Sequence, residues 1–376
     1  MTRTARQRFS GLAAEKATFM PADLTMYIFL GRRGALSQWA LDIAKVAEDR
    51  AILVISRQNE IFDQIQKTGA KVIGIDTFDH GLGALMFLPR IFSIRRELRR
   101  AVISHGVKRV VILMSHVWTP LIGGALKRCG ARYAVIVHDA EPHPGDHTGW
   151  ALRWLIRDAL MADEVVTLST HVARMLVERY PQLKPRVKVL FHPLLGIAST
   201  PTTTSKPPRL RFLFFGRIMP YKGLSLFVSA CELLSRTNVP FDVGIVGQGP
   251  LGPLQKRLEA LGAEIVNRWI QPHEVSAIMS EYDVVVVPNT EASQSGVIPT
   301  ALASGLPVIA TPVGGLPEQI ENGRTGIITD SATTEGLARA MTRFVTEPDL
   351  QITLARGACE LREQLSMSRF LDCLAS

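Results

Sequence analysis

Short apolar runs alternate with amphipathic stretches along most of this chain. Runs such as MYIFL and AILVIS each precede a segment with helical spacing, for example SQWALDIAKVAE. This alternation predicts parallel β-sheets covered by helices, because parallel strands need long crossover connections and are buried on both faces. The same pattern restarts at LRFLFFG and continues to PVIAT.

A proline-rich stretch separates the two series. Residues 199–209 (STPTTTSKPPR) contain three prolines and no large apolar side chain, which indicates an extended linker. We therefore predict an α/β fold with two Rossmann-like domains, residues 24–198 and 210–366, whose parallel sheets face a central cleft. Ligands of open parallel sheets bind beyond the carboxyl ends of the strands, so the cleft is the expected site.

The composition is that of a folded protein. Hydrophobic residues make up 47% and charged residues 20% of the 376 positions. No apolar stretch is long enough for a membrane span, and residues 1–23 look like a basic tail without the apolar core of a signal peptide. The four cysteines lie far apart, which disfavours a disulfide framework and a structural zinc site and favours a cytoplasmic location.

Positive charge is concentrated in the first half. Residues 1–198 contain 28 lysines and arginines against 17 acidic residues, whereas residues 199–376 contain 15 against 17. The segment from Arg90 to His105 has apolar residues at helical spacing, and its neighbouring face carries Arg95, Arg96, Arg99 and Arg100. We predict that these arginines contact an anionic membrane surface; an ordinary solvated helix face is the alternative. Nucleic acid is not expected as a partner, because no stacking aromatics accompany the arginines.

Two segments of the second half are typical of phosphate binding. In FFGRIMPYKG (214–223) a strand ends at Gly216, and Arg217 and Lys222 lie on either side of a turn before a helix, where two cations can neutralise a diphosphate. In NTEASQSGVIPTALASGLPVIATPVGG (289–315) a polar loop leads into a helix of small residues. Its amides at Ser295, Gly296 and Val297 are candidates for phosphate contact.

Together these motifs resemble glycosyltransferase family 4, the retaining enzymes of the GT-B fold. The resemblance rests on G-R-x-x-x-x-K-G, a glycine-rich turn at 246–250 that includes Gly247, and G-L-P-V-I-A-T-x-x-G-G-x-x-E ending at Glu318, and it covers about residues 210–345. It implies that Arg217 and Lys222 hold the donor diphosphate and stabilise the charge of the departing nucleotide. It also implies that residues 267–270, including Arg268 and Trp269, lie beside the nucleoside base and that residues 367–376 pack back on the first domain.

The loop departs from the usual pattern of that family. Two glutamates separated by seven residues are replaced by Ala292 and Thr300, with Glu291 one position early, as in a subset with an S-Q-S-G-V loop. Glu291 is a candidate contact for the donor sugar and Thr300 for the ribose. The identity of the donor stays open between UDP- and GDP-sugars.

The first half resembles the family more loosely. Gly31 to Ala35, including Gly34, follow the first strand as a glycine-rich loop approaching the donor phosphate would, and His138 follows the strand YAVIV at the cleft edge. The resemblance implies that His138 touches the transferred sugar. A structural histidine is the alternative.

The resemblance thus predicts a retaining, metal-independent hexosyltransferase with no cofactor, peripheral to the inner face of the cell membrane. The acceptor would be lipid-linked or a glycan, in the synthesis of bacterial surface polysaccharide.

Other interpretations remain. The acidic and histidine residues from His138 to His147 could form a metal cluster, although prolines break the segment and no Asp-x-Asp is present. Gly247 to Gly252 spell G-x-G-x-x-G, followed by Glu264, as in a dinucleotide-dependent oxidoreductase. Loss of the glutamate pair favours a non-catalytic, membrane-attached nucleotide-sugar-binding protein. A Trp/Arg face at Trp150, Arg153, Trp154 and Arg157 could meet lipid headgroups or a sugar, or pack against a neighbouring element.

Overall fold

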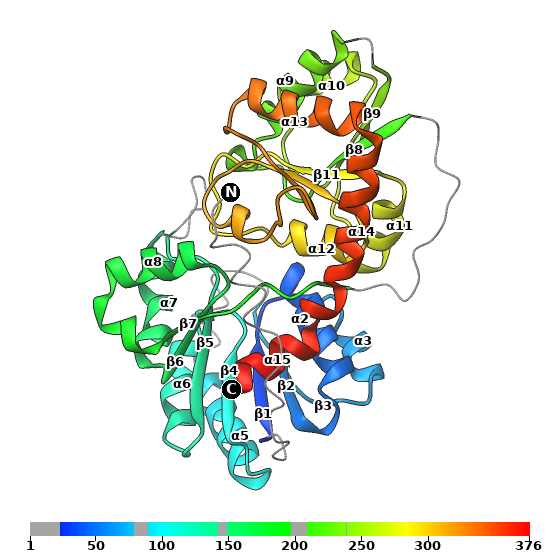
Figure 1. Ribbon diagram of the computed structural model, residues 1–376. Helices are drawn as coiled ribbons and strands as arrows, with labels where there is room; N and C mark the ends of the chain where they lie inside the picture. Colours follow the sequence, from blue (N-terminus) through cyan, green and yellow to red (C-terminus); the bar gives the residue numbers. More distant parts are fainter. Residues whose placement is uncertain (1–22, 79–88, 142–148, 197–208, 238) are drawn as a thin grey trace.

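The chain folds into two α/β domains, each built on one parallel sheet (Figure 1). The computed structural model describes residues 23–78, 89–141, 149–196, 209–237 and 239–376. The predicted tail, apart from Asp23, and the predicted linker, apart from Arg209, lie outside the described residues. The predicted two-domain fold with parallel sheets is confirmed.

The first sheet has the strand order β3-β2-β1-β4-β5-β6-β7. Its strands are β1 (Thr25–Phe29), β2 (Ala51–Ser56), β3 (Lys71–Ile75), β4 (Arg109–Ile112), β5 (Arg132–Val137), β6 (Glu164–Thr167) and β7 (Val187–Val189). Alternate residues of β1 point to opposite faces, so that Met26 and Ile28 enter one core cluster and Tyr27 and Phe29 the other.

Helices cover both faces of this sheet. One face packs against α5 (Arg90–Ser104), α6 (Thr119–Lys127), α7 (Gly149–Met161) and α8 (Thr170–Arg179). The other packs against α2 (Ala35–Val46), α3 (Phe62–Lys67) and α15 (Met367–Ala375). Two 3₁₀ turns, η1 (Glu48–Arg50) and η2 (Pro181–Arg186), precede β2 and β7.

The second sheet has the order β10-β9-β8-β11-β12-β13. Its strands are β8 (Leu210–Phe215), β9 (Phe241–Val246), β10 (Glu264–Val266), β11 (Val284–Val287), β12 (Val308–Ala310) and β13 (Gly326–Ile328). One face packs against α9 (Leu224–Ser235), α10 (Leu254–Ala260) and α13 (Thr334–Thr346), and the other against α11 (Val275–Ser280), α12 (Val297–Ala303) and α14 (Pro348–Gln364). The 3₁₀ turns are η3 (Pro220–Lys222), η4 (Pro272–Glu274) and η5 (Leu316–Glu318).

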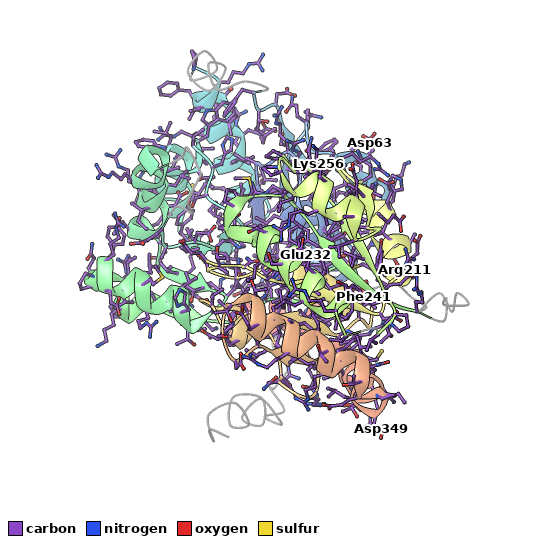
Figure 2. The ribbon with its side chains drawn as sticks, turned by 90° about the horizontal axis from the view of Figure 1, so that it is seen from above. Asp63, Arg211, Glu232, Phe241, Lys256 and Asp349 are labelled. Atoms are coloured by element: carbon purple, nitrogen blue, oxygen red, sulfur yellow. The ribbon has the colours of Figure 1, made fainter. Side chains whose placement is uncertain are left out.

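Seen from above, α9 and α10 lie over the second domain, where Glu232 projects from α9 and Lys256 from α10 (Figure 2). The Glu232 carboxylate accepts a hydrogen bond of 2.8 Å from Arg257 Nε of α10. This ion pair joins the two helices on the surface, away from the first domain.

The last two helices connect the domains. Helix α14 runs down from the second domain, and α15 continues beside α2 of the first (Figure 1). The Phe370 ring is fully buried and meets the Trp39 ring edge-on at 5.1 Å, and Lys188 Nζ donates to the Cys373 carbonyl at 2.6 Å. The carboxyl end of the chain is thus part of the first domain's core.

In each sheet the strand order reverses beside the first strand. The reversal lies between β1 and β4 in the first sheet and between β8 and β11 in the second. Such switch points leave a crevice at the carboxyl ends of the strands, which is where open α/β sheets bind ligands. The residues predicted for the site follow these strands.

Candidate active site

Two helix starts from different domains lie against each other. Gly34 precedes α2 with φ +104°, a conformation that strongly favours glycine, and Gly296 precedes α12. A side chain at Gly296 would approach Ala35 Cβ to 3.3 Å. The glycine-rich loop of the first domain therefore lies against the S-Q-S-G-V loop of the second.

Glycine loops also pack tightly inside the second domain. Gly216 follows β8 and Gly247 follows β9, with φ +114° and +148°. A Cβ at Gly247 would lie 1.8 Å from the Gly216 carbonyl oxygen, and one at Gly216 would lie 3.4 Å from Val297. This close approach joins the Gly216 turn to the start of α12.

The Gly247 turn does not have the geometry expected of a dinucleotide site. It packs on Gly216, and Glu264 is the first residue of β10, at the opposite end of the strand from the cleft. The Glu264 carboxylate pairs there with Arg211. The acidic residue that the oxidoreductase interpretation needs is thus remote from the glycine turn.

Arg217 and Lys222 lie together at the start of the α9 segment. Arg217 is exposed and donates to the Tyr221 hydroxyl at 3.3 Å, whereas Lys222 is largely buried, 5.2 Å from the Tyr221 ring. Burial and, less strongly, the charge of Arg217 lower the pKa of Lys222 to about 8, while Asp139 of the first domain opposes the change. Two close cations with an anion opposite form a site of high positive potential.

The backbone around Lys222 is fixed by close packing. Gly223 has φ +70°, and a Cβ there would lie 1.8 Å from the Pro288 carbonyl oxygen. The Thr290 amide donates to the Tyr221 carbonyl at 2.9 Å. These contacts join the cation turn to the loop after β11, so both predicted phosphate segments form one surface.

His138 lies just beyond β5 and contacts both domains. Its Nε2 is 2.7 Å from the Leu113 carbonyl oxygen, and its Nδ1 is 2.9 Å from Gln294 Nε2. The Trp39 ring meets the imidazole edge-on at 5.8 Å. Burial lowers the pKa of His138 below its ordinary value, although Asp139 acts in the opposite direction.

A carboxylate of the first domain contacts two predicted donor-binding groups. Glu60, which follows β2, accepts from the Gly34 amide at 2.8 Å and from Trp269 Nε1 at 3.0 Å. The guanidinium of Arg33 lies 4.8 Å from the centre of the Trp269 ring. The Glu60 carboxylate thus accepts the hydrogen bond of the amide that is predicted to contact the donor phosphate.

Arg268, the other residue predicted beside the nucleoside base, forms its ion pair within the second domain. Arg268 forms a salt bridge of 2.6 Å with Glu274, which lowers the pKa of Glu274 to about 2 mainly through the hydrogen bond from Arg268. Asn267 bonds both the amide and the carbonyl of Gly249. These contacts connect the residues predicted beside the base to the glycine-rich turn.

The S-Q-S-G-V loop carries the other predicted donor contacts. Glu291 is exposed, and the Thr300 hydroxyl donates to the Gly296 carbonyl at 2.8 Å. The Ser295 amide, predicted to contact phosphate, instead donates to Gln319 Oε1 at 2.8 Å, and Gln319 Nε2 donates back to the Ser295 carbonyl at 3.0 Å. The Val297 amide is 3.3 Å from the Ser295 hydroxyl.

Further bonds between the domains surround this loop. The Ser169 hydroxyl donates to the Ser293 carbonyl at 3.3 Å. The Glu318 carboxylate accepts from the amides of Thr170 and His171, at 2.7 and 2.8 Å, where an anion is stabilised by the dipole of α8.

Sequence reasoning did not identify Glu60 or Gln294 as site residues. The sequence around both residues does point to the site. Glu60 ends a polar run directly after β2, and Gln294 belongs to the S-Q-S-G-V loop.

The predicted basic helix is present as α5. Its apolar residues Ile91, Ile94 and Leu98 are buried, Arg96, Arg99 and Arg100 are exposed, and Arg95 is partly exposed. Phe92 and Ile103 are 74% and 65% exposed, on the same face as Arg96 and Arg99 by helical spacing.

The Trp/Arg face of α7 packs in part against its own domain. Trp154 is partly buried, donates from Nε1 to the Val117 carbonyl at 2.8 Å and lies under Arg157 at 4.5 Å. This favours the packing interpretation for Trp154, while the side chain of Trp150 lies outside the description.

No group of three or more potential metal ligands occurs among the described residues. His143, Asp146 and His147 of the proposed acidic and histidine cluster lie outside them. Every helix in the described part of the chain is too short or too polar to cross a bilayer.

The segment that carries Arg217 and Lys222 is similar to a known protein family. The family profile described as "Glycosyl transferases group 1" matches residues 209–347, so this stretch of the chain is similar to that family. This stretch contains Arg217, Lys222 and the S-Q-S-G-V loop.

Two relatives are D-inositol 3-phosphate glycosyltransferases. That of Saccharomonospora viridis is 32% identical over 174 residues, 43% of this chain and 40% of the relative. That of Thermomonospora curvata is 27% identical over 319 residues, 73% of this chain and 72% of the relative. The chain thus spans about two fifths of the first relative's length.

The fold is that of the GT-B glycosyltransferases. The crystal structure of Anabaena Alr3699/HepE in complex with UDP and glucose superposes with a TM-score of 0.70 at 17% identity, over 94% of this chain and all of that one.

Proposed function

We propose that this protein is a retaining glycosyltransferase that moves a hexose from a UDP- or GDP-sugar to a lipid-linked or glycan acceptor. The observation that carries the proposal is the pair Arg217 and Lys222, held at the cleft face of the second domain opposite Asp139. The complex of the similar fold with UDP and glucose supports a nucleotide-sugar donor.

In the proposed reaction the bond from the anomeric carbon to the diphosphate oxygen breaks, and its electron pair stays on the diphosphate. The acceptor oxygen bonds the anomeric carbon on the same face, and the acceptor proton leaves with the diphosphate. Negative charge therefore develops beside Arg217 and Lys222, whose fixed cations stabilise it more in the transition state than in the bound substrate. No divalent metal or cofactor is part of this proposal, since the two cations supply the neutralising charge.

The other groups have positioning roles in the proposal. The Gly34 amide approaches the donor phosphate, and Trp269 and Arg268 border the nucleoside. Gly216 and Gly247 have no side chains, so the donor can approach the backbone closely. In the proposal Thr300 contacts the ribose and Glu291 contacts the sugar. His138 borders the transferred sugar.

We further propose that α5 contacts an anionic membrane surface, which would place the reaction at the inner face of the cell membrane. Phe92, Arg96, Arg99 and Ile103 follow the spacing i, i+4, i+7 and i+11, so exposed apolar side chains flank exposed cations on one stripe. Such a stripe can combine headgroup attraction with shallow apolar insertion. A role in the synthesis of bacterial surface polysaccharide follows from such an acceptor and location.

The test is a screen followed by an assay. Nucleoside diphosphates and their sugars are first ranked by the increase in melting temperature, since a ligand that binds only the folded state stabilises it. The stabilising donor is then assayed for transfer to acceptors in wild type and Lys222→Ala.

We expect turnover in the variant to fall by roughly a hundredfold or more, with the fold intact. Wild-type turnover in Lys222→Ala would contradict the role of the cations. Nucleotide-sugar binding with no turnover in wild type would instead support a non-catalytic binding protein, which the replaced glutamates Ala292 and Thr300 also allow.

A further inference from the structure

Both ring nitrogens of His138 are occupied by protein groups. Nε2 faces a backbone carbonyl of its own domain, that of Leu113 at 2.7 Å, and Nδ1 faces the side-chain amide of Gln294 in the other domain at 2.9 Å. A carbonyl oxygen can only accept, so Nε2 carries the proton. Nδ1 of the neutral ring then offers a lone pair, and Gln294 donates to it from Nε2.

This arrangement fixes the side chain of Gln294 as well. With its NH₂ group committed to His138, Gln294 Oε1 points away, is shielded from solvent and has no hydrogen-bond partner among the described residues. Leaving a buried acceptor unpaired costs about 1–3 kcal/mol.

The loop that carries Gln294 is itself held on both sides. The Ser293 carbonyl accepts from Ser169 of the first domain, and the Ser295 amide donates to Gln319. The position of Gln294 is thus set by the second domain and by the closure of the cleft. The bond between Gln294 and His138 joins residues of different domains, so it forms only when the domains approach.

We propose that Gln294 is the positioning residue for His138. When the domains close, Gln294 holds the imidazole neutral, with the Nδ1 lone pair of His138 toward the second domain. The proposal rests on the function proposed above, in which His138 borders the sugar. Glycosyl transfer passes through an oxocarbenium-like state with positive charge on the sugar ring. An imidazolium at that place would oppose this charge, whereas a neutral ring does not.

Several charged or titratable groups surround the ring. Asp139, next in sequence, favours the protonated imidazole, and burial opposes it. Lys222 lies near Asp139 and is itself near a cation, Arg217. His192 is neutral, because burial lowers its pKa to about 3. The Leu113 carbonyl fixes the proton on Nε2, and Gln294 supplies the hydrogen-bond donor to the lone pair that remains on Nδ1.

The first test is nitrogen-15 NMR of the histidine rings in the full chain, with His138 assigned by a His138→Gln variant. We expect the neutral Nε2–H tautomer of His138 in wild type from pH 7 to pH 8. A proton on Nδ1, or an imidazolium across this range, would overturn the proposal. This measurement needs no donor, so it stands even if no nucleotide sugar is turned over and the proposed function fails.

The second test replaces the hydrogen-bond donor at position 294. Gln294→Glu replaces the amide by an acceptor and should raise the pKa of His138 by about one to three units, because a carboxylate favours the charged ring. Gln64→Glu, on the exposed side of α3, is the matched control. A titration of His138 in Gln294→Glu identical with that of wild type would contradict the proposal.

The third test uses the donor identified by the screen. Gln294→Leu should lower kcat by roughly ten- to a hundredfold, the scale of misplacing one group in the site, with KM changed far less. Gln294→Glu should also fail to recover activity as the pH rises above the raised pKa, because a carboxylate cannot donate to Nδ1. Wild-type kcat in Gln294→Leu would overturn the proposal, and its melting temperature shows whether the variant is folded.

Discussion

Lys222 should destabilise the fold at neutral pH, because its charge is held in a largely buried position beside another cation. Its pKa falls from 10.5 to about 8 on folding. Each pKa unit corresponds to about 1.4 kcal/mol, so the charged form is disfavoured in the folded state by about 3 kcal/mol. The substitution Lys222→Met keeps the length of an apolar stem and removes the charge.

The direction in which stability changes with pH follows from the number of protons bound to Lys222 in the folded and unfolded states. Between about pH 8 and pH 10.5 the unfolded chain binds a proton at Lys222 that the folded chain has lost, so stability rises with pH across this window. Below pH 8 the full cost is present. We therefore expect Lys222→Met to raise the free energy of unfolding by up to about 3 kcal/mol at pH 7. The gain should shrink as the pH rises toward 10.5.

Urea unfolding at pH 7 and pH 10 measures this difference directly. The matched control is Lys256→Met, since Lys256 is exposed on α10 of the same domain (Figure 2). It should change stability little at either pH. A Lys222→Met variant that is less stable than wild type at pH 7, or whose effect does not depend on pH, would refute the argument.

The same lysine should make nucleotide binding depend on pH. A diphosphate stabilises the protonated amine, so affinity for UDP or GDP should fall by up to about tenfold for each pH unit above 8. In Lys222→Arg, whose guanidinium stays charged, this dependence should disappear. Titration calorimetry between pH 7 and pH 9.5 gives both slopes, and equal slopes in the two proteins would contradict the proposed contact.

Three further predictions concern other parts of the molecule. Glu60→Gln should bind UDP or GDP several-fold more tightly in calorimetry, because the side chain loses the negative charge that repels the diphosphate and competes less strongly for the Gly34 amide. Asp63→Asn is the control, and equal affinities in Glu60→Gln and wild type would contradict this role of Glu60. Replacing the four α5 arginines by serine should weaken sedimentation with vesicles of anionic lipid but not of neutral lipid, and unchanged sedimentation would remove the membrane contact. Glu318→Gln should lower the free energy of unfolding by about 1 kcal/mol, through a weaker cap on α8, and an unchanged urea midpoint would argue against that role.

Much of the fold follows from local pattern. The alternation of apolar runs and amphipathic segments marks the strands before β13, because buried parallel strands are continuous apolar runs. The three-residue β13 and the crossing helix α14 were not among the predicted elements. The first has only two apolar side chains, Ile327 and Ile328, between Gly326 and Thr329, and the second has charged and small residues along most of its length.

The site is predictable only where it follows strand ends. Gly34, His138 and Gly216 were placed in the cleft because residues after parallel strands gather at one edge of a sheet. The pairs between domains were not predictable, since Glu60 and Trp269 are 209 positions apart and His138 and Gln294 are 156 apart. Such pairs depend on the angle between the domains, which no local period encodes. The bond of Ser295 to Gln319 is likewise a tertiary contact.

The account as a whole depends on where a nucleoside diphosphate binds, and a crystal structure of the chain with UDP or GDP decides this. The account predicts phosphate oxygens within about 3 Å of the Arg217 guanidinium and of Lys222 Nζ. A nucleotide bound away from both side chains, with the cleft otherwise accessible in the crystal, would contradict it.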